Sequence, residues 1–311
     1  MTELICMGEP MLELNQQPPG PGGESLFLAG HGGDTSNAAI AAARQGASVA
    51  YLTAVGVDAG GASFMELWSA EGVDTSHVVQ DAVNPTAVYL VHHGPDGHEF
   101  QYYRQGSAAS MYAPTHVPDE AVRSAKILYA SGISQGISNS AADAVFHAID
   151  VARAAGVRVA YDTNYRPRLW PAARASAVIH AAISQSSIAL PGLDDAEALT
   201  GLSDPDAIVD FYLHLGPSLV ALKMGAAGTL LATPQERLRI APFPCQPVDA
   251  TGAGDTFCGA FLARLIAGDA PPDAARYAAC AAALSTTGYG AVPPIPRAEA
   301  VMAALAGAPE F

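Results

Sequence analysis

Basic residues are scarce in this sequence. Its 311 residues include 15 Lys and Arg against 30 Asp and Glu, which gives a formal net charge of −15. Such an acidic chain is expected to bind neither nucleic acid nor an anionic membrane surface. Charged residues make up only 14% of the chain and hydrophobic residues 50%, a balance that excludes intrinsic disorder. An anionic substrate would therefore need a local group of positive charges.

Cysteine is also scarce, and its spacing excludes two kinds of site. No two cysteines form a C-x-x-C pair, so the sequence predicts neither a disulfide framework nor a zinc centre. The N-terminus shows no secretory signal pattern, and no run approaches ~18 apolar residues. We therefore expect a cytoplasmic protein in a reducing compartment, with its cysteines as small core residues at positions Cys6, Cys245, Cys258 and Cys280.

Apolar, strand-like runs alternate with longer helix-like segments after residue 30. This alternation predicts an α/β fold with a mostly parallel sheet covered by helices on both faces. Residues 11–30 and the hairpin pattern of residues 85–108 break the alternation, and we assign them to a small β-sheet lid. The core then comprises residues 1–10, 31–84 and 109–311. Because small sheets need covering, the lid strands predict a homo-oligomer, most simply a dimer.

The most informative segment is residues 248–261, VDATGAGDTFCGAF. Gly252, Ala253 and Gly254 would begin a helix whose apolar face continues to Leu265. Backbone N–H groups and the helix dipole at such a terminus form an anion site. Asp255 follows in the first turn, where a carboxylate can take a proton from an alcohol that attacks a phosphoryl group. An ordinary cap with a glycine turn is the structural alternative.

Two common nucleotide-binding motifs are missing. The chain has no GxxxxGK[ST] sequence, and no G-x-G-x-x-G follows the first strand, which argues against a P-loop enzyme and a Rossmann dehydrogenase. Residues 248–261 instead resemble the C-terminal signature of the ribokinase-like (PfkB) carbohydrate kinases, D-T-x-G-A-G-D-x-F. The resemblance implies a ribokinase-like three-layer α/β/α core with a β-sheet lid, and ATP and Mg²⁺ as cofactors. It also implies that Asp255 is the general base and that the amides of Gly252, Ala253 and Gly254 stabilise the transferring phosphoryl group.

A second family signature, G-G-x-x-x-N, is matched near the N-terminus by Gly32-Gly33-Asp34-Thr35-Ser36-Asn37. Glycine lets the backbone approach a sugar closely, while Asp and Asn side chains can bind its hydroxyl groups. The resemblance implies that the substrate-binding residues here are Gly32, Gly33, Asp34 and Asn37. The structural alternative is a turn in which Asp34 or Ser36 caps a helix over residues 37–45.

Two segments that contain arginine bear on the choice of sugar. These are residues 102–108 (YYRQGSA), in the expected lid, and residues 162–170 (DTNYRPRLW), after a predicted strand of the core. Ligands of open α/β sheets bind beyond such strand ends. Arg104 and Arg166, converging from lid and core, would suit a substrate carboxylate. Alternatively, Arg166 and Arg168 are surface residues that pair with some of the many acids.

Within the PfkB family, these segments resemble those of the 2-keto-3-deoxygluconate kinases. That resemblance implies ATP-dependent phosphorylation of a sugar acid, 2-keto-3-deoxygluconate, at its 6-hydroxyl. It also implies substrate contacts from Tyr89, Tyr102, Arg104 and Arg166. A fructokinase or ribokinase that acts on a neutral sugar is an alternative, as is a non-catalytic sugar or nucleotide sensor on the same fold.

The remaining expectations concern nucleotide and metal. The turn after residues 219–223 resembles the family's K-x-G-x-x-G, which implies nucleotide binding by Lys223, Gly225, Ala226 and Gly228. Gly192 replaces the Asn of the family's N-x-x-E magnesium motif. Asp195 stands in the place of its Glu and is the expected Mg²⁺-linked acid, with Asp194 and Glu197 as alternatives. Residues 281–292 resemble a region that flanks the adenine and, in some family members, helps to bind a monovalent cation.

Overall fold

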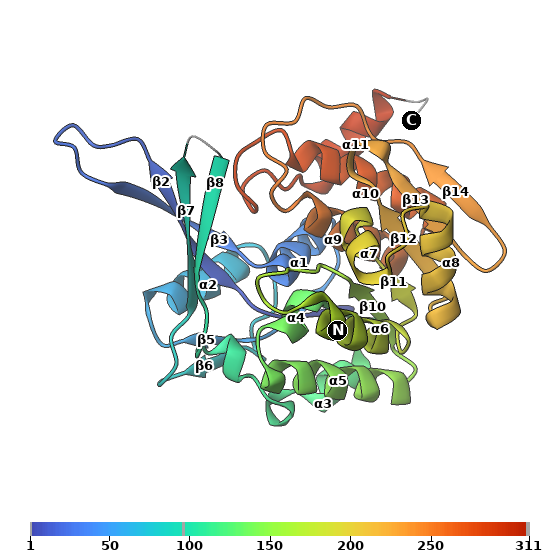
Figure 1. The fold of residues 1–311 in the computed structure, drawn as a ribbon, viewed down its shortest axis with the longest axis horizontal. Helices are drawn as coiled ribbons and strands as arrows, with labels where there is room; N and C mark the ends of the chain where they lie inside the picture. The colour runs from blue at the N-terminus through green and yellow to red at the C-terminus, as the bar shows by residue number, and fades with distance from the viewer. Residues whose placement is uncertain (1, 95–96, 309–311) are drawn as a thin grey trace.

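An eight-stranded sheet forms the centre of the protein in a computed structural model that describes residues 2–94 and 97–308 (Figure 1). The strand order is β14-β13-β12-β11-β10-β9-β1-β4, and all neighbours from β12 to β4 are parallel. Most of these strands are continuous apolar runs, as expected when helices cover both faces. Their bounds are β1 (Leu4–Met7), β4 (Val49–Leu52), β9 (Ile127–Ser131), β10 (Arg158–Asp162), β11 (Ile188–Ala189), β12 (Leu219–Lys223), β13 (Thr229–Ala232) and β14 (Arg237–Ile240).

Helices cover both faces of this sheet, and each face has its own apolar core. One core packs beneath α1 (Asp34–Arg44), α2 (Ala59–Ala70), α9 (Ala253–Ala267), α10 (Pro271–Ser285) and α11 (Ala298–Ala306). The other packs beneath α3 (Asp119–Ser124), α5 (Asn139–Ala154), α6 (Ala172–Ile183), α7 (Leu193–Thr200) and α8 (Pro205–Leu215). Among the described residues, no helix is both long and apolar enough to cross a membrane.

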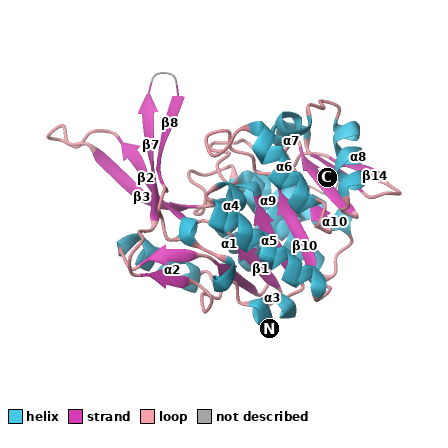
Figure 2. Cartoon of the chain, turned by 60° about the horizontal axis from the view of Figure 1, so that its bottom comes forward, coloured by secondary structure: helices cyan, strands magenta, loops and turns pink. Residues whose placement is uncertain are grey.

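A separate four-stranded sheet projects from one side of this core (Figures 1 and 2). Its order is β3-β2-β7-β8, and only the β2–β7 pair is parallel. Its strands are β2 (Met11–Gln17), β3 (Leu26–Gly32), β7 (Ala87–Gly94) and β8 (Gly97–Tyr103). Two short strands, β5 (Ala54–Gly56) and β6 (Val79–Asp81), pair with each other and come after β4 and before β7 in the chain. The expected three-layer core with a smaller separate sheet is confirmed.

Three local expectations were wrong. The apolar run 49–55, whose pattern predicts a single strand, forms two strands separated at Thr53, and β4 and β5 belong to different sheets. The helix expected over residues 37–45 begins at Asp34, and no side chain caps it because the cap residue is Gly33. The Asp34 carboxylate is bonded to Ser131 and Asn164 instead. Cys245 is exposed, whereas Cys6, Cys258 and Cys280 are buried. Pro95 and Asp96, in the turn of the predicted hairpin, lie outside the described residues.

Candidate active site

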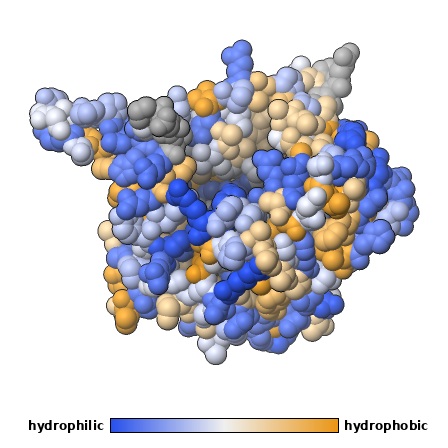
Figure 3. All heavy atoms as spheres, in the orientation of Figure 1, coloured by the Kyte–Doolittle hydropathy of each residue, from blue (hydrophilic) through white to orange (hydrophobic). Residues whose placement is uncertain are grey.

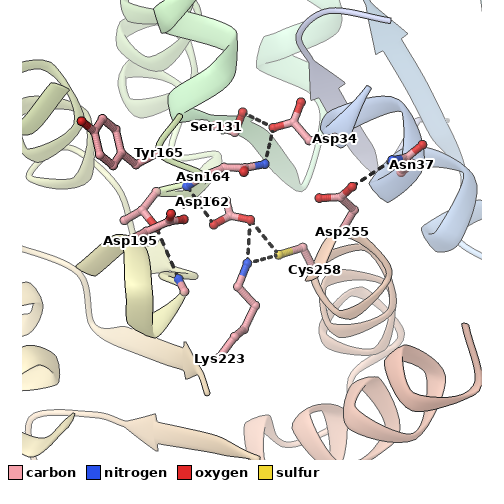
Figure 4. Close-up of polar contacts among 12 residues, drawn as sticks. Asp34, Asn37, Ser131, Asp162, Asn164, Tyr165, Asp195, Lys223, Asp255 and Cys258 are labelled. Atoms are coloured by element: carbon pink, nitrogen blue, oxygen red, sulfur yellow. Dashed lines mark hydrogen bonds and ion pairs between the residues drawn. The ribbon is translucent and has the colours of Figure 1, made fainter. Parts of the chain in front are cut away.

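The carboxyl ends of the parallel strands bring polar residues to one edge of the large sheet. Ser131 ends β9, Asp162 ends β10 and Lys223 ends β12, while Glu9 follows β1. The first turns of α1 and α9 reach the same place, as Figure 4 shows. The surface seen in Figure 3 is hollowed between the smaller sheet and the core, and hydrophilic side chains surround the hollow. Such a strand-end crevice is where open α/β sheets bind ligands.

Asp255 lies in the first turn of α9 and faces α1. Its Oδ2 accepts a hydrogen bond of 2.8 Å from Asn37 Nδ2. The helix begins at Ala253 after Gly252, whose φ of 76° is left-handed, and the backbone at Gly254 is exposed. Burial and the nearby Asp34 carboxylate raise the pKa of Asp255 to about 7. A carboxyl group of that pKa, in the first turn of a helix whose N-terminus attracts negative charge, is suited to accept a proton near neutral pH.

Asp34 is the second acid of the site, and it is held in place by the last residue of β9 and by a residue of the loop after β10. Ser131 Oγ and Asn164 Nδ2 both donate to its Oδ2, the latter over 2.8 Å. Within the described part of the chain, Oδ1 of Asp34 and Oδ1 of Asn37 are buried without a hydrogen-bond partner. Buried acceptors are normally satisfied, so these two oxygens indicate a ligand that donates hydrogen bonds, as sugar hydroxyls do.

The two glycines before Asp34 let the backbone approach other groups closely, as the motif predicted. The groups they approach are protein atoms, whereas the motif predicted a sugar. A Cβ on Gly32 would lie 2.6 Å from the Tyr89 hydroxyl. One on Gly33, where φ is 117°, would lie 2.4 Å from the backbone oxygen of Glu9. Tyr89 itself is buried and donates to Glu13. The glycines therefore let β3 pass directly into α1 beside β1 and β7.

Arg104 is at the end of the smaller sheet, but its charge is already compensated. Its guanidinium pairs with the buried Glu9, which also accepts a bond of 3.2 Å from Ser107. Burial raises the pKa of Glu9 despite this pairing. The guanidinium lies 5.7 Å from the ring centroid of Tyr102, and its Nε is buried with no partner among the described residues. The buried Nε–H of Arg104 is thus a donor that a ligand can satisfy.

Arg166, in contrast, is exposed and forms no ion pair within the part of the chain that the structure describes. Its Nη1 donates to the backbone oxygen of Tyr165 over 3.0 Å, and its charge acts to lower the pKa of both Asp34 and Asp195. The Glu9 carboxylate that holds Arg104 also interacts with Asp34. The structure therefore brings both arginines to the surroundings of Asp34. Arg168 instead reaches the smaller sheet, where Nη1 donates to the backbone oxygen of Phe100 over 2.5 Å.

The expected nucleotide turn is exposed, but the ammonium of its lysine is turned inward. Residues 225–227 form a 3₁₀ turn, and Gly225 and Gly228 have left-handed φ values of 54° and 86°. A Cβ on Gly228 would lie 2.1 Å from the backbone oxygen of Ile240, so this position requires glycine. Lys223 Nζ lies 2.6 Å from Asp162 Oδ2 and 3.3 Å from Cys258 Sγ. Gly225, Ala226 and Ala227 are exposed, whereas Gly228 is buried and its amide donates to the backbone oxygen of Gly225 over 3.0 Å.

Asp195 has the environment of a weakly bonded carboxylate. It lies in the first turn of α7, and Thr163 Oγ1 donates to it over 3.4 Å. Burial and Asp162 raise the pKa of Asp195 to about 6. No group of three or more His, Cys, Asp or Glu residues that could hold a metal occurs in the described ranges. These features fit Mg²⁺ bound through one carboxylate, phosphate oxygens and water, which is the usual arrangement with nucleotides. Asp194 is exposed.

Several site residues were missed from the sequence. Asn164 adopts a φ of 27°, which is strained for a residue other than glycine, and in that conformation donates to Asp34. Cys258 was expected to be only a core residue, yet its thiol contacts Asp162 over 3.4 Å. Glu9, Ser131 and Asp162 stand at or just after strand ends, and that position is the signal that could have identified them.

Comparison with known proteins finds a family model and named relatives that cover most of the chain. The model of the pfkB family of carbohydrate kinases matches residues 1–298. The chain is 33% identical to a 2-dehydro-3-deoxygluconokinase of Thermoproteus tenax, over 98% of this chain and 95% of the relative. It is 29% identical to fructokinase-2 of Solanum habrochaites, over 98% and 96%.

Solved structures show the same fold. A PfkB protein from Polaromonas sp. JS666 has a TM-score of 0.88 at 31% identity, covering 97% of this chain and 100% of that one. A ribokinase-like protein from Escherichia coli, solved with ATP and Mg²⁺, has a TM-score of 0.90 at 22% identity, covering 99% and 100%. With a family model matched over most of its length and a strand-end site that holds an acid beside a helix N-terminus, the chain belongs to the pfkB family of carbohydrate kinases.

Proposed function

We propose that this kinase transfers the γ-phosphoryl group of ATP to the 6-hydroxyl of a sugar acid, 2-keto-3-deoxygluconate. The observation that carries the choice of a sugar acid is Arg166, an exposed guanidinium with no carboxylate partner among the described residues, close to Asp34. In so acidic a chain, an arginine left free beside a site is suited to pair with a substrate carboxylate. The relative named 2-dehydro-3-deoxygluconokinase supports the same substrate.

The proposed chemistry uses residues already in contact. The free oxygens of Asp34 and Asn37 bind sugar hydroxyls, and Asp255 takes the proton of the terminal hydroxyl as its oxygen attacks the γ-phosphorus. The bond from phosphorus to the β–γ bridging oxygen breaks, and ADP leaves. The amides of Gly252, Ala253 and Gly254 stabilise the charge on the transferring phosphoryl oxygens.

Nucleotide and metal are assigned to the neighbouring strand ends. The exposed turn of residues 225–227 offers the amides of Gly225 and Ala226 to the ATP phosphates, and the buried Gly228 closes that turn. Asp195 would hold Mg²⁺, which supplies positive charge to the phosphate oxygens when bound. Repeating the kinase assay in potassium and in tetramethylammonium chloride decides whether a monovalent cation takes part.

The smaller sheet is proposed to act as a lid, with residues 11–30 and 85–108 moving as a unit over the core formed by residues 1–10, 31–84 and 109–311. Tyr89, Tyr102 and Arg104 lie on its strands or at their end and border the site. Closure over the sugar would exclude water and limit ATP hydrolysis. The bond from Arg168 to Phe100 already joins lid and core.

A neutral sugar is the second candidate, and one observation favours it. Glu9 already neutralises Arg104, so of Arg104 and Arg166 only the latter lacks a carboxylate partner among the described residues. The fructokinase relative points the same way. A non-catalytic sensor is the third, and sugar-dependent ADP production would exclude it.

The test compares kcat/KM for 2-keto-3-deoxygluconate, 2-ketogluconate, fructose and ribose in one ADP-release assay. We expect the first sugar acid to be the best substrate. Arg166→Met should raise its KM by about tenfold or more, because a charge-assisted pair is lost, and should leave the KM for fructose nearly unchanged.

Arg174→Met serves as the matched control, since Arg174 is an exposed arginine bonded to Asn139. The sugar-acid assignment fails if fructose has the highest kcat/KM, or if Arg166→Met affects both sugars alike.

A further inference from the structure

A buried ion pair lies at the centre of the site, and the proposed mechanism does not use it. Lys223 ends β12 and Asp162 ends β10, and their charged atoms are 2.6 Å apart. The exposed fraction is 15% for the lysine side chain and 3% for the aspartate. Removing two charges from water costs free energy, so a buried ion pair needs further contacts to hold it. Such a pair by itself contributes little to the stability of the fold.

The further contacts come from α9, the helix that carries Asp255. Cys258 Sγ lies 3.3 Å from the Lys223 ammonium and 3.4 Å from Asp162 Oδ2, so the three groups form a closed triangle (Figure 4). A Cβ placed on Gly254 would lie 3.8 Å from Lys223 Nζ. The ammonium therefore lies against the first turn of α9, next to the residue that precedes Asp255 in the chain.

Acidic groups dominate the surroundings of Asp255. Asp34 on α1 and Asp162 on β10 act against its ionisation, whereas the Asn37 amide and the Lys223 ammonium favour it. On α10, Tyr277 contacts Arg264 in the last turn of α9, at the opposite end of that helix from Asp255. Other ionisable groups interact with Asp255 or with Asp34, Asp162 and Lys223 beside it. They include Cys6 on β1, Glu9 after it, Tyr51 on β4, Tyr129 on β9, Tyr161 on β10, Arg166 after it, Asp195 on α7, Tyr212 on α8 and Cys258 on α9.

We propose that Lys223 and Asp162 are a positioning pair for the general base: Asp162 and Cys258 hold the Lys223 ammonium against the first turn of α9, where its charge keeps Asp255 able to accept the sugar proton. This inference rests on the proposed role of Asp255. Lys223 thus acts from inside the core, through Asp255, in addition to any attraction for the nucleotide. Asp162 acts against the ionisation of Asp255 by itself, and its contribution is to fix the lysine.

The proposal predicts that neutralising either member of the pair shifts the pH profile, in opposite directions for the two residues. Lys223→Met removes a positive charge and should move the acidic limb of the kcat/KM profile to higher pH by about one unit. Asp162→Asn removes a negative charge and should move the same limb to lower pH. The double variant, Lys223→Met with Asp162→Asn, contains no buried unpaired charge and should return the limb close to its wild-type position. A purely structural pair would lower turnover without shifts of opposite sign.

The exposed pair Arg239–Asp206, on β14 and α8, provides matched controls. Arg239→Met and Asp206→Asn make comparable charge changes away from the site and should leave the limb in place. The inference is overturned if the two core variants move the limb in the same direction, or by no more than the controls. If Lys223→Met does not fold, Asp162→Asn and the double variant still decide the sign.

A second measurement separates this inference from the proposed reaction. In each background, the change in unfolding temperature caused by Asp255→Asn is followed from pH 4 to pH 9 without substrate. The pH at which this change reaches half of its full size reports the ionisation of Asp255. That pH should be higher with Lys223→Met and lower with Asp162→Asn. Such shifts in a protein that phosphorylates no sugar would refute the proposed function alone. If that pH does not move in an active kinase, the inference alone is refuted.

Discussion

Asp255 shows how single residues acquire their chemistry from their neighbours. An aspartate with an ordinary pKa is too weak a base for an alcohol at neutral pH. Here burial and Asp34 raise the pKa of Asp255 to about 7, while its bond from Asn37 orients the carboxylate. Near pH 7 about half of the Asp255 carboxyl groups are then ionised, and the ionised form binds a proton more strongly than an ordinary aspartate does.

Asp255→Asn should lower kcat by several orders of magnitude, because an amide cannot take the hydroxyl proton. The same change should raise thermal stability in a pH-dependent way. Between about pH 4 and pH 7 the unfolded chain loses the Asp255 proton more readily than the folded chain, so the wild type loses stability as the pH rises. The variant lacks this loss. Its gain in unfolding temperature over the wild type should therefore grow from pH 4 to pH 7 and stay constant above.

Asp210→Asn is a suitable control, since that acid lies in an exposed pair with Arg237 and should show little pH-dependent gain. Near-normal turnover of Asp255→Asn would refute its role as base. A gain that shrinks as the pH rises would refute the raised pKa.

At the scale of elements, the site depends on how closely α1 and α9 pack. Each helix contributes one side chain to the Asn37–Asp255 bond. The close approach depends on Gly259, where a Cβ would lie 2.2 Å from the backbone oxygen of Ala38 and 2.8 Å from the Ala41 side chain. Gly259 belongs to the signature segment 248–261, and its packing against α1 explains why that position of the segment is a glycine.

Gly259→Ala should therefore force the helices apart. We expect a loss of about 1–3 kcal/mol in the free energy of unfolding, typical of overpacking, together with a lower kcat as the Asn37–Asp255 bond lengthens. Urea unfolding and steady-state kinetics measure the two effects. Gly307→Ala is the control, because the nearest contact there would be an ordinary 3.5 Å. Unchanged stability in Gly259→Ala would show that the helices can move apart at no cost.

At the scale of the molecule, two surfaces matter: the acidic shell and the smaller sheet. Most Lys and Arg side chains pair with acids, whereas Arg166 and Arg168 have no carboxylate partner in the described ranges. Local charge at the site can therefore oppose the net charge of −15. The edge strand β3 exposes 45% of Leu26 and 62% of Leu28. An apolar, unpaired strand edge is a surface on which a second copy can pack.

We propose that this edge forms the dimer interface, and Leu26→Lys with Leu28→Lys should convert a dimer to a monomer. Buried lysines at such an interface would be costly, and the edge would repel its copy. Light scattering coupled to size exclusion gives the mass. Val83→Lys is the control, since Val83 is 86% exposed and lies outside the smaller sheet. A wild-type monomer at micromolar concentration, or a dimer that survives both lysines, would refute the interface.

The sequence by itself determined the fold class, the separate small sheet and the family. Strand and helix periodicity are local properties, and the segments 32–37 and 248–261 carry their chemistry in consecutive residues. It also led to Asp34, Asn37 and Asp255, which those two segments contain, and to Arg166 in residues 162–170. The bond between Asn37 and Asp255 joins residues 218 positions apart, yet it follows once the two motifs lie at one sheet edge.

Only the tertiary structure decided how the charges pair. Glu9 takes up the charge of Arg104, 95 positions away, while Asp162 and Cys258 hold Lys223 from 61 and 35 positions away. The strands β1, β9, β10 and β12 become neighbours or near neighbours through sheet order, and no local pattern encodes that order. The physical reason is that a charged group takes its partner, and therefore its pKa, from whichever residues the sheet brings near it.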